Sequence, residues 1–261
     1  MNEPTPLGLP EVADLLDQSP HTRKAILVGG QALNVLAVHY GLDAIATAVS
    51  NDIDFFGNAT LAREAGKAWG GRTRKPDMDN HTPNSALVLV EIHGQTHQID
   101  FMSQILGVQA NELENWAASV EVGGKAFHVM HPLHVLQSQL QNVYGVLDRR
   151  SMGPRALSRT ALAIKVAERS TREYLDDGDI RAARKAAERV VEIAATEAGL
   201  RAWHADRLDL LTAIPSHNKW PEEFLEKRLP QIRDMLAKQR EEYARKQKRR
   251  PPKSGPQSAL R

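Results

Sequence analysis

Three aspartates lie within short runs of β-branched and aromatic residues, and this pattern constrains the fold more than any other feature of the chain. Asp52 and Asp54 belong to the run S-N-D-I-D-F-F, and Asp100 belongs to the run H-Q-I-D-F-M. Because alternate residues of a strand point to opposite faces, each aspartate is expected to face away from the core that its apolar neighbours enter. Carboxylates gathered on one face of apolar strands are costly unless a cation or a hydrogen-bond donor meets them.

A pair of glycines follows the first apolar run of the chain. Residues 25–28 read A-I-L-V and predict a short strand, which Gly29 and Gly30 end, and residues 31–40 have the pattern of a helix. Glycine lets the backbone approach a ligand closely, and the first N–H groups of a helix bind phosphate. Gly29 and Gly30 are therefore candidate phosphate contacts.

The three carboxylates suit a pair of hard cations, for which Mg²⁺ is the expected choice. In two-metal catalysis, ions roughly 3.5–4 Å apart stabilise the attacking and leaving oxygens of an in-line displacement. Asp52 and Asp54 would hold the metals and a triphosphate. Asp100 would hold the metal nearer the acceptor and take the proton of the attacking hydroxyl.

The order of these motifs resembles a known signature. L-V-G-G-Q-A-L at residues 27–33, followed by S-N-D-I-D-F-F at residues 50–56, is similar to the polymerase-β-like nucleotidyltransferases, and most similar to the AbiEii type. That family transfers a nucleotide from an NTP to an acceptor with Mg²⁺ and includes toxins of toxin–antitoxin pairs. Over about residues 20–140, the resemblance implies phosphate contacts for Gly29, Gly30 and Ser50, and metal ligation for Asp52, Asp54 and Asp100.

Two positions depart from the family pattern. The family usually has an arginine just before its serine, and residues 40–49 contain none. The helix after the strands often carries a lysine, and Gln139 stands in its place here. The resemblance then implies that Lys165 or Arg159 supplies the missing cation from the next helix, or that the chain is a catalytically silent nucleotide-binding or interaction module.

Strand signals are confined to the first half of the chain, which predicts an α+β fold. We expect a nucleotidyltransferase domain with a mixed sheet at residues 1–130, a helical domain at 131–248 and a basic disordered tail at 249–261. Within the first domain, hairpins are predicted across residues 93–96 and Gly123-Gly124, and residues 72–85 are predicted as a loop. The later helices are predicted at residues 155–172, 179–197, 201–213 and 221–248.

The formal charge of +2 conceals an uneven distribution. Residues 227–261 contain 12 basic and 3 acidic side chains, whereas residues 1–226 contain 22 basic and 29 acidic ones. A basic end is typical of a contact with a polyanion such as tRNA or another RNA, and equally of a solubilising tail.

Composition excludes several classes of protein. The chain has no cysteine, so disulfides, thiol nucleophiles and cysteine-ligated metal centres are excluded. It has neither the pattern of a signal peptide nor a run of 18 apolar residues, so no membrane span is expected. These features predict a cytoplasmic protein.

The histidines do not indicate a metal site. His93 and His97 flank a predicted turn and are interpreted as hairpin surface. His128, His131 and His134 have no carboxylate at a metalloprotease spacing and are interpreted as solvent-facing or helix-capping residues.

These observations predict a Mg²⁺-dependent enzyme that moves a nucleotide from an NTP such as ATP to an acceptor hydroxyl and releases pyrophosphate. RNA is one candidate acceptor, and a protein hydroxyl or a small molecule is another. A cognate antitoxin is an expected partner if the chain is a toxin, and the catalytically silent module is the alternative function.

Overall fold

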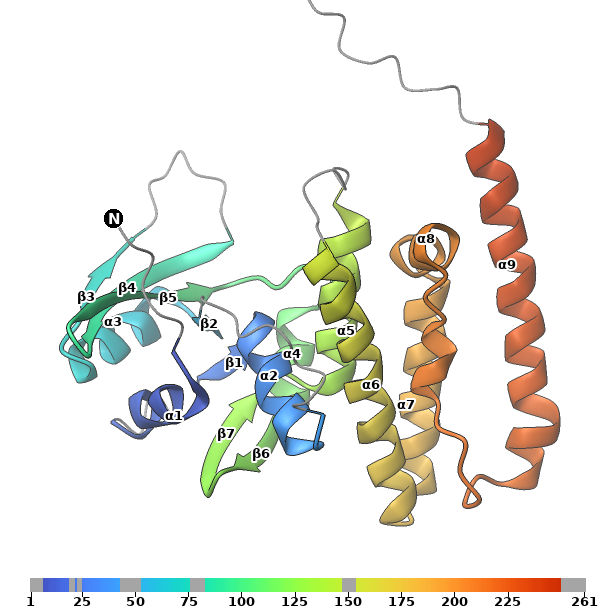
Figure 1. Cartoon of the computed structure of the whole chain (residues 1–261), viewed down its shortest axis with the longest axis horizontal. Helices are drawn as coiled ribbons and strands as arrows, with labels where there is room; N and C mark the ends of the chain where they lie inside the picture. Colours follow the sequence, from blue (N-terminus) through green and yellow to red (C-terminus); the bar gives the residue numbers. More distant parts are fainter. Residues whose placement is uncertain are drawn as a thin grey trace, which may run out of the picture.

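The computed structural model describes residues 7–18, 22, 25–42, 53–75, 83–146 and 154–249. Within these residues, seven strands form one sheet in the order β3-β4-β5-β2-β1-β7-β6 (Figure 1). The strands are β1 (Ile26–Val28), β2 (Ile53–Phe56), β3 (Arg72–Arg74), β4 (Asn84–Ile92), β5 (Gln95–Met102), β6 (Ala118–Val122) and β7 (Lys125–Val129). The pairs β2–β5 and β1–β7 run parallel, and the other neighbours run antiparallel. This mixed sheet agrees with the predicted α+β class, and both predicted hairpins are confirmed.

Helices pack against the sheet and then against one another. They are α1 (Leu9–Asp17), α2 (Gly29–His39), α3 (Ala59–Ala68), α4 (Ala110–Trp116), α5 (Pro132–Leu140), α6 (Pro154–Asp176), α7 (Ile180–Ala195), α8 (Glu197–Asp206) and α9 (Leu229–Arg249). Helix α3 contacts β3 and β4, and α2 contacts β1, β2, β6 and β7. Short π-helical segments, Gln141–Gly145 and Phe224–Arg228, extend α5 and precede α9.

Aromatic side chains fill the centre of the sheet half. Phe55 and Phe101 have no exposed surface, and their ring centroids are 5.6 Å apart. The ring of Trp69 lies 6.1 Å from each of them, and its indole N–H donates to the backbone oxygen of Leu15 at 2.7 Å. These rings join β2 and β5 to the helices beneath them, so the two central strands depend on one aromatic cluster.

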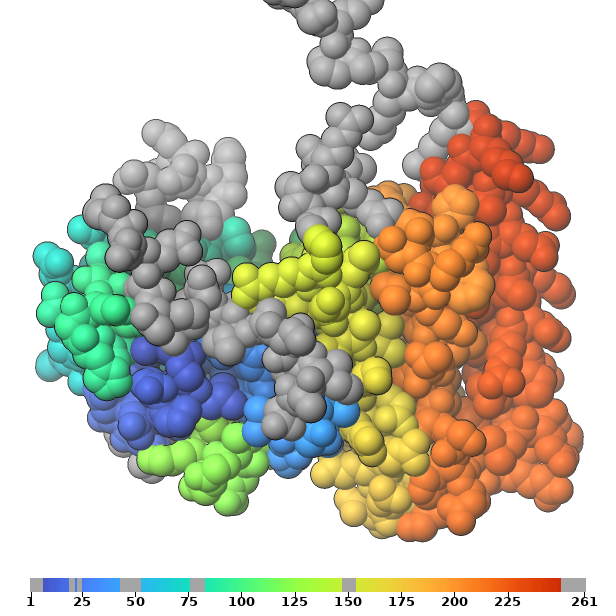
Figure 2. All heavy atoms as spheres, in the orientation of Figure 1, coloured from blue at the N-terminus to red at the C-terminus, as the bar shows by residue number. Residues whose placement is uncertain are grey.

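The helical half is a layered array of helices that begins against the sheet half. Helix α5 contacts α2 and α6, and α6 contacts α7. A stripe of small and branched residues packs α7 closely against its neighbours, as its periodicity predicts, and its buried members are Ala183, Ala186, Ala187, Val190, Ile193 and Ala194. Helix α9, red in Figure 2, lies at the outer side of the array and buries only Ile232 and Leu236. None of the helices in the described part of the chain is long and apolar enough to cross a membrane.

Buried apolar residues of both halves form one continuous cluster. The structure therefore does not separate the helical half as a domain of its own. The boundaries 1–130, 131–248 and 249–261 stay a prediction, and residues 250–261 of the expected tail lie outside the described residues.

Two elements differ from their sequence-based predictions. The expected loop at residues 72–85 is wrong at both ends, because β3 pairs with β4 at the edge of the sheet and β4 already begins at Asn84. Charged side chains on a short edge strand protect the edge from pairing with another chain, so polarity there does not signal a loop.

The expected helix at residues 201–213 is confirmed up to Asp206 and is wrong beyond it. Helix α8 is capped by Thr196, which accepts a hydrogen bond from the N–H of Gly199, and the helix ends at Asp206. Arg207 adopts a left-handed conformation that breaks the helix, and Asp209 then caps a short 3₁₀ turn, Leu210–Ala213.

The interpretation of the histidines is partly wrong. His93 is exposed in the hairpin turn, but His97 is buried on β5. His131 caps α5, as predicted, because its Nδ1 accepts the N–H of Leu133 at 3.2 Å. His134 does not face solvent: it is 3% exposed, because Trp116 and His131 pack around it.

Acid should destabilise the protein through the buried pair of His131 and His134. Burial, and then the charge of His134, lowers the pKa of His131 to about 4. Burial, helped by Arg189 and opposed by Glu112, lowers the pKa of His134 to about 4 as well. Since both imidazoles regain a pKa near 6.5 in the unfolded chain, unfolding takes up protons. The free energy of unfolding is therefore highest above about pH 6.5 and falls as the pH drops toward 4.

Urea denaturation between pH 7.5 and pH 4.5 measures this loss. The variant His134→Gln should be less stable at neutral pH but should show a shallower fall, because one of the two titrating groups is gone. If the free energy of unfolding of His134→Gln fell with pH as steeply as that of the wild type, His134 would not be a source of the acid sensitivity.

Truncation of the aromatic cluster should weaken the whole fold. Phe101→Ala should lower the free energy of unfolding by about 3–5 kcal/mol, because it removes a fully buried ring and leaves a cavity. Val38→Ala, at a position that is 38% exposed, is the control and should change it by less than about 0.5 kcal/mol. Urea denaturation followed by circular dichroism checks both values.

Candidate active site

Asp54 and Asp100 occupy paired positions on neighbouring parallel strands. In the register of β2 and β5, Ile53 pairs with Ile99 and Asp54 pairs with Asp100. The apolar members are buried and both aspartates are half-buried, as the alternation of the sequence predicts. Since paired residues of adjacent strands point to the same face, the structure brings these two carboxylates together on one side of the sheet.

The backbone at Gly29 closes against the carboxylate of Asp54. Strand β1 pairs with β2 so that Val28 lies opposite Asp54, and Gly29 follows as the first residue of α2. Gly29 has a φ of +64°, and a Cβ at this residue would lie 2.5 Å from Oδ2 of Asp54. Both the conformation and the close approach require glycine here.

Helix α2 begins beside the carboxylates without a side-chain cap. Its N-cap, Val28, makes no side-chain hydrogen bond to the helix, and Gly30 is the second helical residue. The first N–H groups of a helix lack partners within the helix, so an anion at this end would receive hydrogen bonds and a favourable dipole.

A cleft of about 810 Å³ opens in front of Gly29 and Asp54. One wall comes from the end of β5 and the segment after it, and contains the apolar side chains Met102, Ile105, Leu106 and Val108. Ser138 of α5 and Asn142 of the π-helical segment also line the cleft. A cleft of this size with an apolar wall and a few polar groups has the character of a small-molecule site.

Side chains from three helices hold the apolar wall in place. Gln137 of α5 donates from its amide to the backbone oxygen of Gly107. Arg189 of α7 donates to Oε1 of Gln137 and to Oε2 of Glu112, each at 3.0 Å. Gly107 has a φ of +82°, and a Cβ there would lie 2.4 Å from the side chain of Gln141. The wall therefore depends on contacts from α4, α5 and α7.

The predicted site residues fall into two groups. Gly29, Gly30, Asp54 and Asp100 gather at the carboxyl end of β1, the amino end of β2 and the adjoining strand β5. Ser50 and Asp52 lie outside the described residues. Their roles, like those of the other four, stay predictions.

Sequence reasoning missed Ser138 and Asn142, which also line the cleft. They are four residues apart, so they lie on one face of a helix, but this spacing has no meaning until the rest of the cleft is known. Gln139, at the expected lysine position, points elsewhere: its amide nitrogen lies 3.5 Å from the backbone oxygen of Ala156 in α6. Lys165 is exposed on α6, and none of the described residues that line the cleft is a lysine or an arginine.

The residues present fit a hard divalent cation. Asp54 and Asp100 supply carboxylate oxygens from paired positions on one face of the sheet, and Gly29 lets the carboxylate of Asp54 lie directly against the start of α2. Within the described residues, no cluster of three or more acidic or histidine side chains could hold a metal. Asp52, the third predicted ligand, is outside them.

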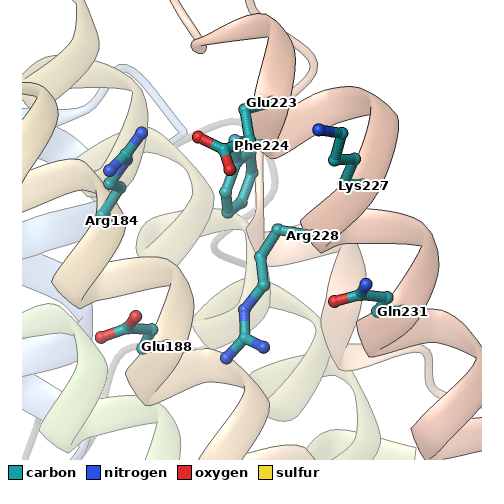
Figure 3. Close-up of a pocket in the computed structure, with 7 residues that line it drawn as sticks. All are labelled: Arg184, Glu188, Glu223, Phe224, Lys227, Arg228 and Gln231. Atoms are coloured by element: carbon teal, nitrogen blue, oxygen red, sulfur yellow. The ribbon is translucent and has the colours of Figure 1, made fainter.

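A second groove, of about 330 Å³, lies between α7 and the segment that precedes α9 (Figure 3). Arg184, Lys227 and Arg228 alternate with two carboxylates, Glu188 and Glu223, which lie well apart (Figure 3). The groove therefore lacks both a carboxylate pair and a glycine at a helix start, which leaves the cleft at Asp54 as the candidate site.

Comparison with known proteins adds a structural likeness and no match by sequence. No family model matches the chain, and no curated protein matches it by sequence. The solution structure of the antibiotic-resistance factor ANT(2'')-Ia is similar with a TM-score of 0.41 and 13% identity, over 67% of this chain and 96% of that chain. A TM-score of this size is too low to support an argument, so the function is inferred from the geometry of the site and the motifs.

Substitution of Gly29 should affect metal binding as well as stability, because the added side chain both strains the backbone and displaces the carboxylate of Asp54. Gly29→Ala adds a Cβ that meets Asp54, whereas Gly70→Ala adds one at a φ only one degree different, +63°, with no described atom within 4 Å. Both variants should lose about 1–2 kcal/mol of stability from the left-handed conformation. Only Gly29→Ala should also weaken Mn²⁺ binding, by at least about tenfold, because the carboxylate must move.

Urea denaturation and a Mn²⁺ titration followed by electron paramagnetic resonance (EPR) measure the two effects. Equal Mn²⁺ affinity in both variants would show that Gly29 does not shape a metal site.

Proposed function

We propose that this chain is a Mg²⁺-dependent nucleotidyltransferase that moves a nucleotide from an NTP, such as ATP, to an acceptor hydroxyl. One observation supports this function above the others: Asp54 and Asp100 are register partners, and the glycine that begins α2 closes against Asp54 at the mouth of a cleft. A carboxylate pair beside a helix start suits a metal-bound triphosphate. The G-G-Q-A-L and S-N-D-I-D-F motifs support the same function.

Asp52, Asp54 and Asp100 would hold two Mg²⁺ ions. When bound, such ions neutralise the charge that develops on the attacking and leaving oxygens of a phosphoryl transfer. Gly29 and Gly30 would bind a phosphate through the backbone at the start of α2, and Ser50 would contribute its hydroxyl.

In the proposed reaction, the acceptor oxygen attacks the α-phosphorus of the NTP. A bond forms between that oxygen and phosphorus, the bond to the β-phosphate bridging oxygen breaks, and pyrophosphate leaves. Asp100 would accept the proton of the acceptor hydroxyl as the bond forms. The cleft walls would exclude water from the reacting groups, because their apolar side chains face the cavity.

RNA, with tRNA as one form, is the acceptor that the charge distribution favours. Helix α9 contains seven basic and three acidic residues and leaves most of its surface exposed, so it can contact phosphates without reading sequence. A role as a toxin, with a cognate antitoxin as partner, follows from the resemblance alone. A protein hydroxyl and a small-molecule hydroxyl are the other acceptors that the assay below distinguishes.

A catalytically silent nucleotide-binding or interaction module is the second candidate. The observation that favours it is the absence of lysine and arginine from the described lining of the cleft, together with the contact of Gln139 with α6. A triphosphate bound there would need its cations from metal ions or from residues outside the described part of the chain.

Transfer of label from α-³²P NTPs to total RNA, total protein or hydroxyl-bearing small molecules should reveal the activity of the full chain with Mg²⁺. Asp54→Asn should reduce the rate by roughly 100- to 1,000-fold, the size expected when one electrostatic contact to the transition state is lost. Asp177→Asn, on an exposed turn after α6, is the matched control and should retain full activity.

Transfer that survives Asp54→Asn would contradict the metal assignment. Measurable NTP binding without transfer from any of the four NTPs would favour the silent module. The acceptor pool that becomes labelled identifies the substrate class.

A further inference from the structure

The side chain of Gln98 contacts the carboxylate of Asp100, one of the two aspartates paired between β2 and β5. It precedes Asp100 by two residues on β5, so the two side chains share one face of the strand. The amide nitrogen of Gln98 donates to Oδ1 of Asp100 at 3.0 Å. This is the length of an ordinary N–H···O hydrogen bond.

The position of Asp100 along the chain does not depend on this bond. Backbone pairing sets it from both sides, because Asp100 lies opposite Leu87 of β4 and opposite Asp54 of β2. Gln98 is itself exposed and pairs with Leu89. What the side-chain bond constrains is the orientation of the carboxylate, since a hydrogen bond to one oxygen disfavours rotation about the Cβ–Cγ bond.

A neutral amide suits this task better than a charged donor. A lysine or arginine at residue 98 would also bind the carboxylate, but its positive charge would oppose a divalent cation at the same group. A carboxylate at residue 98 would repel Asp100. An amide orients the acid and leaves its negative charge available.

We propose that Gln98 is a positioning residue that orients Asp100 to bind the divalent cation. The inference rests on the proposed function only in assigning Asp100 to a metal site. Residues that hydrogen-bond to a metal-ligating side chain contribute about 10- to 100-fold to metal affinity or activity, because an oriented side chain loses less freedom when the metal binds.

The test compares two variants on the same strand face. Gln98→Met keeps the size of the side chain and removes the donor. Thr96→Val is the matched control, because Thr96 is exposed on the same face two residues further from Asp100. Mn²⁺ affinity of the full chain is measured without nucleotide by EPR, and Asp100→Asn defines the effect of losing the ligand itself.

Gln98→Met should weaken Mn²⁺ binding by about 10-fold, while Thr96→Val changes it by less than about 2-fold. In the transfer assay, the Mg²⁺ concentration that gives half-maximal rate should rise for Gln98→Met, with a smaller change in the rate at saturating Mg²⁺. An altered fold alone would not raise the Mg²⁺ requirement while leaving the rate at saturating Mg²⁺ less changed. An unchanged urea denaturation midpoint of Gln98→Met would exclude an altered fold.

The outcomes separate the two proposals. If the wild-type chain binds Mn²⁺ and Gln98→Met binds it equally well, the role of Gln98 is overturned while the proposed function stands. If the wild-type chain and Asp100→Asn bind Mn²⁺ alike, Asp100 is no ligand, and both the metal assignment and the role of Gln98 are overturned.

Discussion

The register between β2 and β5 is the constraint on which the rest of the site depends. The same alignment that pairs Ile53 with Ile99 and Phe55 with Phe101 in the core also places Asp54 beside Asp100 on the other face. A shift of one residue would turn the aromatic side chains to the outside and the aspartates into the core, which is far more costly. Burial of the rings therefore holds the two carboxylates close together despite their mutual repulsion. A divalent cation bound there would relieve that repulsion without altering the core.

Strand β1 joins the glycine turn to this pair. Because Val28 lies opposite Asp54, the chain must leave β1 directly against the carboxylate, and only a glycine has room to do so. The start of α2 consequently lies next to the acids. A phosphate held by the helix start and a metal held by the carboxylates would share one location, which is the arrangement that transfer of a phosphoryl-linked group requires.

The helical half contributes the shape of the cleft more than its charge. Arg189 on α7 acts through Gln137 on α5 to hold Gly107, so a wall beside the strand ends depends on a helix from the other half of the chain. Ser138 and Asn142, which the helical half contributes to the lining, are neutral. Shape and hydrogen bonding therefore dominate the described part of the cleft, where the start of α2 is the feature that favours a negative ligand.

The sequence alone determined the central strands β1, β2 and β5 and the polarity of their faces. Alternation around Asp54 and Asp100 predicted which side chains enter the core, and Gly29-Gly30 predicted the turn into α2, because these signals are local and follow from strand and helix geometry. Polarity misled the prediction at residues 72–85, where edge-strand pairing supplies the hydrogen bonds, and at His134, which neighbouring helices bury.

Only the tertiary structure decided what lies opposite the aspartates. The pairing of β2 with β5 joins segments more than 40 residues apart, and the walls of the cleft come from residues that no local pattern connects. The contact of Gln98 with Asp100 and the contact of Gln139 with α6 follow from the way each side chain packs in the fold. A sequence specifies which residues prefer burial, but distant residues meet only through the packing of the whole chain, and here that packing set the site.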